Sequence, residues 1–246
     1  MLLKFAKTSD AAQKFVSIAV YGEPGIGKTT LAKTLGVADD RVLFLSADRG
    51  HISVSDKDFV LVRKLANDAE MFEFITHVEN EAKAGKIAWL VVDGFDTMAD
   101  DIVERERAWE AKQEKPNQYG PYDRLYSKGR AFAQRIQNAN CHSLFTFQMT
   151  RDDKASTPYS FAFPGIKLND KLIAYFDNVL PMRLVTFAAD GKTVTKRMLQ
   201  TRRDNGGDRN YECKCRDPHK RIAAYEEPNI AALVEKMTKP APEVKA

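Results

Sequence analysis

The sequence predicts an α/β protein in which a mainly parallel central sheet is flanked by helices and followed by a C-terminal β-hairpin. Three observations lead to this prediction. Short apolar runs rich in β-branched residues alternate with helical patterns along most of the chain. The first run ends directly in a glycine-rich turn, and a late pair of runs surrounds Asp190-Gly191, a dipeptide typical of hairpins. With 246 residues, the chain is long enough for one large domain with a well-buried core.

Strands are expected where apolar runs are short and bounded by turn residues, a pattern typical of strands that are buried on both faces. The expected strands are 15–21, 41–48, 58–62, 87–93 and 142–148, followed by the two strands around Asp190-Gly191. Residues 149–169 have little periodicity and are expected to form a long loop, which in a compact domain usually serves function. We expect an N-terminal extension at 1–14, a core at 15–227, and a helix with a flexible tail at 228–246.

Helices are expected between these strands. One is expected to begin near Lys28 and to end at Gly36. The pair Asn67 and Glu70 predicts a capped amphipathic helix with apolar residues along one face. These apolar residues are Met71, Ile75, Val78 and Ala82. The polar stretch 98–117 predicts a solvated helix followed by a loop, and Pro121 can open a further helix.

Composition and charge exclude several classes of protein. No apolar run approaches the ~18 residues needed to span a bilayer, and charged residues interrupt the N-terminal stretch where a secretory signal would be apolar. We therefore expect no membrane partner and a cytoplasmic location. The cysteines, Cys141, Cys213 and Cys215, are too few for a disulfide framework. A net charge of +4 is compatible with nucleic-acid contact but does not establish it.

The strongest motif follows the first expected strand. Gly22-Glu-Pro-Gly25-Ile-Gly27-Lys28-Thr29 matches the phosphate-binding pattern G-x-x-x-x-G-K-[ST] in full. Glycines let the main chain curl so that several N–H groups point at a phosphate, and a helix N-terminus adds partial positive charge. Lys28 would reach the β- and γ-phosphates, and the Thr29 hydroxyl would bind Mg²⁺. ATP and Mg²⁺ are thus the expected cofactors, bound by Gly22, Glu23, Pro24, Gly25, Ile26, Gly27, Lys28, Thr29 and Thr30.

Further catalytic candidates lie at the ends of apolar strands. The run Leu90-Val-Val-Asp93 places a carboxylate where ligands bind in open α/β sheets, and Asp93 would hold Mg²⁺. Asp48 and Asp96 compete for the role of activating water, and we favour Asp48, whose alternative role is to cap the turn before Gly50. Gln148 is expected either to sense the γ-phosphate or to make an ordinary strand-end hydrogen bond.

Together these residues resemble the RecA-like P-loop ATPases, in particular the short phage-encoded ATP-binding proteins of single-strand annealing and recombination. The resemblance covers roughly 16–221 and rests on YGEPGIGKTTLA, LVVDGFD, LFTFQ and the late segment RMLQT…NYECKCRD. In that family the late segment holds an arginine followed by a lysine-x-arginine pair, which match Arg197, Lys214 and Arg216 here. The chain departs from the family at Asp48, where a glutamate is common, and at Gly94, where a small hydroxyl residue is usual.

The resemblance implies a homo-oligomer, a ring or a filament, in the cytoplasm of a phage host. Lys214 and Arg216 of one subunit would then stabilise charge on the nucleotide of the next subunit. The alternative is a solvated strand face, because these cations alternate with cysteines. The resemblance also implies that the loop after Gln148 contacts single-stranded DNA, through cations for phosphates and aromatic rings for bases. The candidate DNA-binding residues are Arg151, Lys154, Tyr159, Phe161 and Lys167. The alternative for Phe161 and Phe163 is that they fold inward as anchors of the loop. The implied activity is ATP hydrolysis that serves phage recombination, annealing or replication.

Three alternatives stay open from the residues themselves. A remodeller or helicase loader of the AAA+ type would act on a protein partner, although Gly94 stands where such proteins usually place a glutamate. A small-molecule kinase with the same loop would need an arginine-rich lid and an acceptor pocket. Cys213, Cys215 and His219 could supply three zinc ligands, or the two thiols could pack as alternating strand residues.

Overall fold

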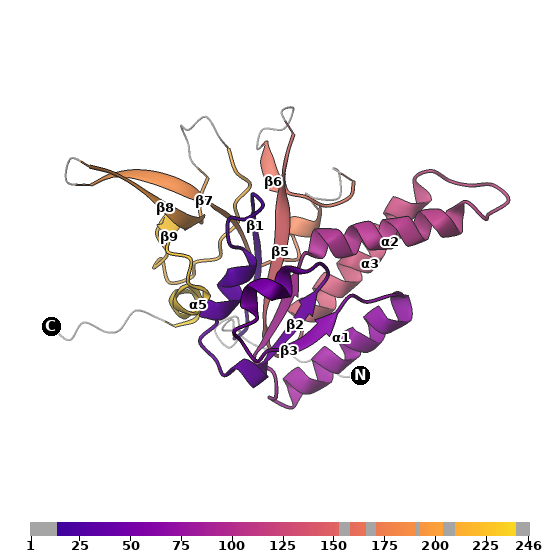
Figure 1. The fold of residues 1–246 in the computed structure, drawn as a ribbon, viewed down its shortest axis with the longest axis horizontal. Coiled ribbons are helices and arrows are strands. Elements are labelled where there is room, and N and C mark those ends of the chain that lie inside the picture. Colours follow the sequence, from indigo (N-terminus) through magenta and orange to yellow (C-terminus); the bar gives the residue numbers. More distant parts are fainter. Residues whose placement is uncertain (1–13, 153–157, 166–170, 190–191, 204–209, 240–246) are drawn as a thin grey trace, which may run out of the picture.

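The structure, a computed structural model, describes residues 14–152, 158–165, 171–189, 192–203 and 210–239 (Figure 1). Its centre is one sheet with the strand order β3-β2-β4-β5-β1-β7-β8-β9, and β6 pairs with the end of β5. The strands are β1 (Ser17–Gly22), β2 (Val42–Ser46), β3 (Val60–Arg63), β4 (Trp89–Asp93), β5 (His142–Arg151), β6 (Tyr159–Phe161), β7 (Asn178–Ala189), β8 (Lys192–Gln200) and β9 (Tyr225–Glu226).

The pairing confirms the predicted α/β class. Strands β3, β2, β4, β5, β1 and β7 run parallel to their neighbours, whereas β6, β8 and β9 pair in the antiparallel direction. β7 and β8 form the expected C-terminal hairpin, whose tip at 190–191 lies outside the described residues. Of the predicted N-terminal extension, only Lys14 is described, and the tail beyond Lys239 also lies outside the described residues.

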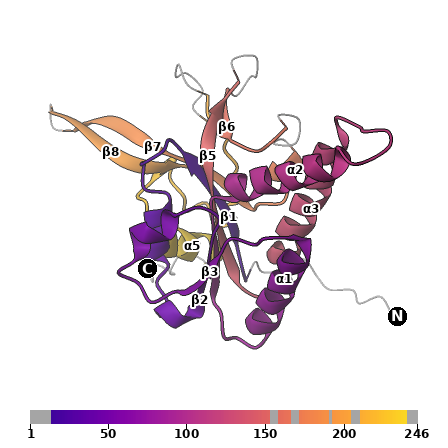
Figure 2. The same cartoon turned by 45° about the vertical axis from the view of Figure 1, so that its right-hand side comes forward.

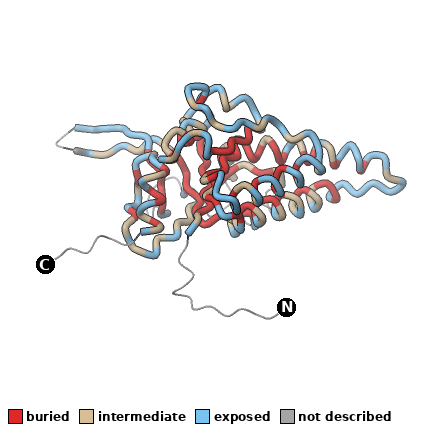
Figure 3. Tube along the Cα trace, turned by 90° about the horizontal axis from the view of Figure 1, so that it is seen from below, coloured by how far each residue is buried: buried red, intermediate tan, exposed pale blue. Residues whose placement is uncertain are grey.

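Helices cover both faces of the sheet (Figure 2). Helices α1 (Asp68–Lys83), α2 (Phe95–Glu110) and α3 (Gly120–Gln137) pack on one face around a cluster of aromatic rings. The short 3₁₀ helix η2 (Thr29–Thr34) and helix α5 (Ile230–Thr238) pack on the other face. Buried positions are concentrated between these layers, whereas the outer part of the β7–β8 hairpin and the far end of the α2–α3 pair are exposed (Figure 3).

Local sequence explains where α1 begins and which face it buries. The Asn67 side chain accepts a hydrogen bond from the Glu70 N–H at 3.0 Å, and the Glu70 carboxylate accepts one from the Ala66 N–H at 2.7 Å. The predicted cap is therefore present. The predicted apolar face is also confirmed, because Met71, Ile75, Val78 and Ala82 are all buried.

Helix α5 supports the helix that follows the glycine-rich turn. The Ile230 N–H donates to the Thr34 hydroxyl at 2.9 Å. Gly36 has a φ of +71°, and a Cβ built on it would lie 2.8 Å from the Cβ of Ala231. A larger residue at position 36 would thus meet both backbone strain and α5.

Two expectations about single elements are wrong. β3 is the last strand at one edge of the sheet, so Val60 and Leu61 are exposed rather than buried on both faces. The stretch 98–117 is not a fully solvated helix, because α2 begins at Phe95 and buries one side. Its buried glutamates, Glu106 and Glu110, pair with Arg124, which explains why the charge pattern alone misleads.

Two further segments differ from the prediction. The helix after the glycine-rich turn is the 3₁₀ helix η2 rather than a regular α-helix. The expected loop 149–169 includes β6, which pairs antiparallel with the end of β5, so part of this segment is an extension of the sheet.

The aromatic cluster allows a test of the core. Phe132 is fully buried against the rings of Phe74, Phe95 and Phe145. We expect Phe132→Ala to lower the free energy of unfolding by about 3–5 kcal/mol, because it removes buried apolar surface and leaves a cavity. Urea denaturation measures the change, and Phe72→Ala, at a ring that is 45% exposed on α1, is the matched control. Equal losses in the two variants would contradict this packing.

Candidate nucleotide-binding site

The glycine-rich turn connects β1 to η2 at the carboxyl edge of the parallel strands. Gly25 and Gly27 have φ values of +76° and +100°, which L side chains rarely adopt. A Cβ on Gly22 would lie 2.5 Å from the Met182 carbonyl oxygen of β7. Both backbone conformation and close packing therefore require glycine, as expected of a loop that curls around a phosphate.

Lys28 is folded back over this loop. Its Nζ donates to the carbonyl oxygens of Gly22 and Glu23 at 2.9 and 3.0 Å, and to Oε1 of Gln148 at 3.3 Å. Burial lowers the pKa of Lys28, while the nearby carboxylates of Asp96, Asp93 and Asp48 oppose that change. The ammonium group is thus largely removed from water and held where a negatively charged ligand would relieve its cost.

Asp93 ends β4, as predicted, and is almost fully buried. It accepts hydrogen bonds from the Thr29 hydroxyl at 2.9 and 3.1 Å and from the Thr146 hydroxyl at 2.6 Å. Burial raises the pKa of Asp93, and the charge of Asp48 adds to the rise, although the two hydroxyl donors oppose it. A hydroxyl beside a buried carboxylate is an oxygen donor set that suits Mg²⁺.

Asp48 and Asp96 both face this centre. They line the same cavity of about 210 Å³, together with Gly25, Gly27, Lys28, Thr29, Thr30, Ser53, Asp93, Gly94, Thr146, Phe147 and Gln148. Asp48 also accepts from the Gly50 N–H at 2.6 Å, so the turn-capping role is present as well. Asp96 is buried, which raises its pKa, and it accepts from the Gln148 N–H at 3.2 Å. Geometry therefore brings both acids within the site.

The backbone conformation explains why position 94, which departs from the family pattern, is a glycine. Its φ is +77°, and a Cβ there would lie 3.4 Å from Oδ2 of Asp48. The Gly94 N–H donates to the Thr146 hydroxyl at 2.9 Å, which in turn binds Asp93. Glycine at this position thus lets the chain turn from β4 into α2 while Asp93 and Asp48 stay close.

Gln148 forms hydrogen bonds with both the P-loop lysine and Asp96. Its side chain binds Lys28, and its backbone binds Asp96. Glu23 and Ile26, also predicted to bind nucleotide, line a neighbouring cavity of about 170 Å³ with Met149, Met182, Arg183, Leu184 and Tyr211. The predicted P-loop residues are therefore divided between two cavities, and Gly22 and Pro24 line neither of them.

Sequence reasoning omitted Thr146 and Ser53 from the site, and it named Arg197 only as the match to the family's late arginine, without a role. Thr146 lies two residues before Gln148, and its polarity inside the apolar run 144–147 is a signal for a shared face. Ser53 lies in the 3₁₀ helix η4 (Gly50–Val54), and the sequence around it has no such pattern. A Cβ on Gly27 would overlap the Arg197 guanidinium, with its Cζ at 3.3 Å, so Arg197 from β8 lies directly against the loop.

Lys214 and Arg216 lie away from the carboxyl edge of the sheet in this chain, toward the amino ends of the parallel strands. Lys214 pairs with Val179, which is level with Ala19 in the middle of β1. Its Nζ contacts the carbonyl oxygens of three residues before β7, namely Ile173, Ala174 and Phe176. Arg216 forms an ion pair with Asp177 at 3.0 Å. The structure does not bring these cations to the P-loop of their own chain, and a role in a neighbouring subunit stays a prediction.

The DNA-contact candidates divide into three groups. Phe161 is fully buried against Phe147 and Tyr21, so its predicted contact with bases is wrong; the ring anchors β6 in the core. Tyr159 is half-buried and stacks on Tyr211 at 4.8 Å, with the exposed Arg151 guanidinium 5.5 Å from its ring. Lys154 and Lys167 lie outside the described residues.

Zinc is not supported by the described side chains. Across the described ranges, no group of three or more histidine, cysteine, aspartate or glutamate side chains is arranged to hold a metal. Burial raises the pKa of the Cys215 thiol to about 12, which disfavours the thiolate that zinc needs. In the same part of the chain, no helix combines the length and apolarity that a membrane span requires.

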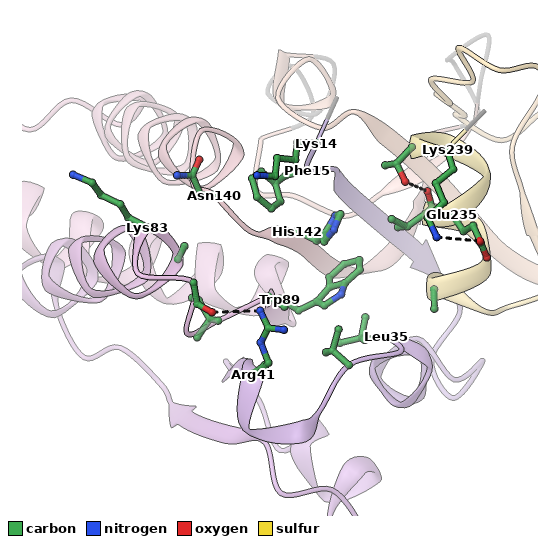
Figure 4. A pocket seen from close by; sticks show the side chains of 18 residues that line it. Lys14, Phe15, Leu35, Arg41, Lys83, Trp89, Asn140, His142, Glu235 and Lys239 are labelled. Atoms are coloured by element: carbon green, nitrogen blue, oxygen red, sulfur yellow. Dashed lines mark hydrogen bonds and ion pairs between the residues drawn. The ribbon is translucent and has the colours of Figure 1, made fainter. Parts of the chain in front are cut away.

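A larger cavity, of about 690 Å³, lies at the amino ends of the parallel strands (Figure 4). Trp89 and His142 stack there at 4.7 Å, and burial lowers the pKa of His142 to about 4. Lys239, at its rim, pairs with Glu235. This cavity contains neither a glycine-rich turn nor the strand-end carboxylates, so the smaller cavity at the carboxyl edge is the candidate site for a nucleotide.

Two solved structures show low similarity to this chain. One is described as a prototypical ATPase from the type III secretion system of pathogenic bacteria, with 15% identity and a TM-score of 0.45 over 70% of this chain. The chain spans about half (55%) of that protein's length. The other is the KaiC-like protein PH0186 from Pyrococcus horikoshii OT3, with 12% identity, a TM-score of 0.43, and coverage of 80% of this chain and 83% of that one. Neither likeness carries an argument about activity or assembly.

A search of curated proteins finds no match. The AAA domain family, in contrast, matches residues 14–209, which is most of the chain. The matched region contains the glycine-rich turn, Asp93 and Gln148, which the structure brings together around one cavity. The chain therefore belongs to the AAA domain family and has the site of a P-loop nucleotide-binding protein.

Proposed function

We propose that this protein is a Mg²⁺-dependent ATPase that acts on single-stranded DNA in phage recombination, annealing or replication. The observation that carries the ATPase part is the convergence of Lys28, Thr29, Asp93 and Gln148 on one cavity at the carboxyl edge of the sheet. The DNA part rests on the resemblance to phage recombination proteins and on the strand extension that follows Gln148.

Each residue has a role that follows from its chemistry. The backbone N–H groups of the P-loop would bind the α- and β-phosphates, and Lys28 would move from its carbonyl partners to the β- and γ-phosphates. Thr29 and Asp93 would hold Mg²⁺, which neutralises charge on the phosphates when bound. Asp48 and Asp96 are the candidates to orient and deprotonate water, because both carboxylates line the same cavity.

Gln148 supports a connection between the nucleotide and DNA. Its amide oxygen binds Lys28, and the next residues of β5 extend with β6 beyond the P-loop (Figure 1). Arg151 and Tyr159 lie directly opposite each other at the end of this extension. A guanidinium group beside an aromatic ring suits the phosphates and bases of a single strand. The proposal includes assembly into a homo-oligomer, in which Lys214 and Arg216 would serve the adjacent subunit.

A second candidate is an AAA+-type remodeller or helicase loader that acts on a protein partner. Membership of the AAA domain family favours it. The residue after Asp93 is Gly94, not the glutamate that such proteins usually place there, so we rank it second. Stimulation of ATP turnover by single-stranded DNA, without a protein partner, separates the two functions.

Loss of the P-loop lysine tests the ATPase proposal. We expect Lys28→Ala to reduce ATP turnover by about 10²-fold or more, because it removes a cation from the developing phosphate charge. Release of inorganic phosphate measures turnover. Lys33→Ala, at a lysine on η2 that pairs with Asp56, is the matched control and should keep wild-type turnover. Undiminished hydrolysis in Lys28→Ala would exclude this site as the source of activity.

Asp93 gives a test that separates stability from function. Folding raises the pKa of Asp93, so its charge destabilises the fold above the unfolded-state pKa, and this cost disappears as pH falls through the raised value. We expect Asp93→Asn to raise the free energy of unfolding at pH 7 by on the order of 1 kcal/mol, with a smaller gain in acid, while Mg²⁺-dependent turnover is lost.

Denaturation at several pH values measures the stability change of Asp93→Asn. Asp56→Asn is the control, because its pair with Lys33 lowers the pKa of Asp56 and neutralisation should give no gain. A destabilised Asp93→Asn variant with normal turnover would argue that Asp93 is a structural residue and not a magnesium ligand.

The DNA proposal is tested at the end of β5. We expect single-stranded DNA to stimulate ATP turnover, and Arg151→Ala to weaken DNA binding and reduce the slope of log affinity against log salt by about 1. Fluorescence anisotropy with a labelled oligonucleotide at several salt concentrations measures both quantities. Arg63→Ala, at the exposed end of β3, is the control. Identical salt slopes in wild type and Arg151→Ala would count against DNA contact here.

A further inference from the structure

Arg197 is a charged residue of the site that the roles above leave unused. It belongs to β8, opposite Leu184 of β7, and its guanidinium lies against Gly27 of the P-loop. Gly27 immediately precedes Lys28, so Arg197 is at the phosphate end of the site. Both the lack of a side chain at Gly27 and its φ of +100° leave room for this contact.

The position of β8 follows from the sheet. β7 pairs in parallel with β1 up to Tyr21↔Pro181, and the next residue, Met182, packs its carbonyl oxygen against Gly22. β8 runs back along β7, with Leu199 opposite Met182. The hairpin is thus fixed beside the P-loop by its pairing with the strand that leads into that loop, and Arg197 approaches from the same chain.

Within the part of the chain that the structure describes, Arg197 has no protein counter-ion. Among the described residues, no hydrogen bond or ion pair is found for its side chain, which is exposed. Its neighbour Lys196 instead pairs with Glu227. Successive residues of a strand point to opposite faces, so only Arg197 of the two faces the loop. A second cation close to Lys28 is unfavourable unless an anion lies between them.

We infer that Arg197 binds the γ-phosphate of the nucleotide in its own chain. The N–H groups of the P-loop surround the α- and β-phosphates, so the terminal phosphate depends on Lys28, the metal and cations from outside the loop. The planar guanidinium can donate two parallel hydrogen bonds to phosphate oxygens. Because Arg197 belongs to β8, a terminal phosphate would also tie the β7–β8 hairpin to the P-loop. This inference rests on the proposed function.

Calorimetry with a non-hydrolysable ATP analogue and with ADP, both with Mg²⁺, tests the inference. We expect Arg197→Ala to weaken binding of the analogue by about 10- to 100-fold, the loss of one charged hydrogen-bonding group, while ADP binding changes by less than about 2-fold. Arg197→Lys keeps the charge without the bidentate geometry and should recover part of the affinity. Lys196→Gln is the matched control on the same strand and should behave as the wild type.

The outcomes distinguish this inference from the function on which it rests. A wild-type chain that binds neither nucleotide would overturn both. A wild-type chain that binds both, with Arg197→Ala unchanged or with equal losses for the analogue and ADP, would overturn only the role of Arg197. The ADP affinity also reports whether the variant has kept its fold.

A mixing experiment tests whether Arg197 acts within its own chain. Arg197→Ala chains have an intact P-loop, and Lys28→Ala chains have an intact Arg197. If Arg197 acts in the same chain, a mixture should hydrolyse ATP no faster than the sum of the two variants. Turnover well above that sum would show that Arg197 serves a neighbouring subunit and would overturn the assignment.

Discussion

The register of three central strands determines the site. β5 lies between β4 and β1, with Val92 opposite Phe145 on one side and Gly22 opposite Gln148 on the other. This alignment places Thr146 beside Asp93, and Gln148 beside the start of the P-loop. A shift of β5 by one residue would turn both polar side chains to the face covered by α2 and α3 and would separate Lys28, Asp93 and Asp96 from their present partners.

Folding brings like charges together at this site and removes charged groups from water, and both effects are unfavourable. Three carboxyl groups, Asp48, Asp93 and Asp96, line one small cavity with a partly desolvated ammonium group. Burial raises the pKa of Asp93 and Asp96 and lowers that of Lys28, so each of these groups is held against its preference for water. A metal cation carries the charge opposite to the three carboxylates, and a polyphosphate carries the charge opposite to Lys28. Binding of both would therefore offset the unfavourable electrostatic energy of these groups.

Much of this arrangement could be predicted from the sequence because it is local. The P-loop spacing, the strand that ends in Asp93 and the cap at Asn67 each depend on residues close together in the chain. The approach of Arg197 to Gly27 depends on the pairing of β1, β7 and β8, which no local pattern contains. The same limit explains why the predictions for Phe161 and β3 are wrong. Alternation does not show which side of a loop faces the core. Composition does not show which strand is last in the sheet.

Helix α5 has a consequence for the order in which the chain matures. It packs against η2 through Ile230 and Ala231, so a segment 196 residues later in the chain completes the support beneath the helix that follows the P-loop. A nascent chain on the ribosome would expose the whole phosphate-binding motif long before that support exists. The contacts of α5 with the helix after the P-loop therefore form only once 230–238 have left the exit tunnel.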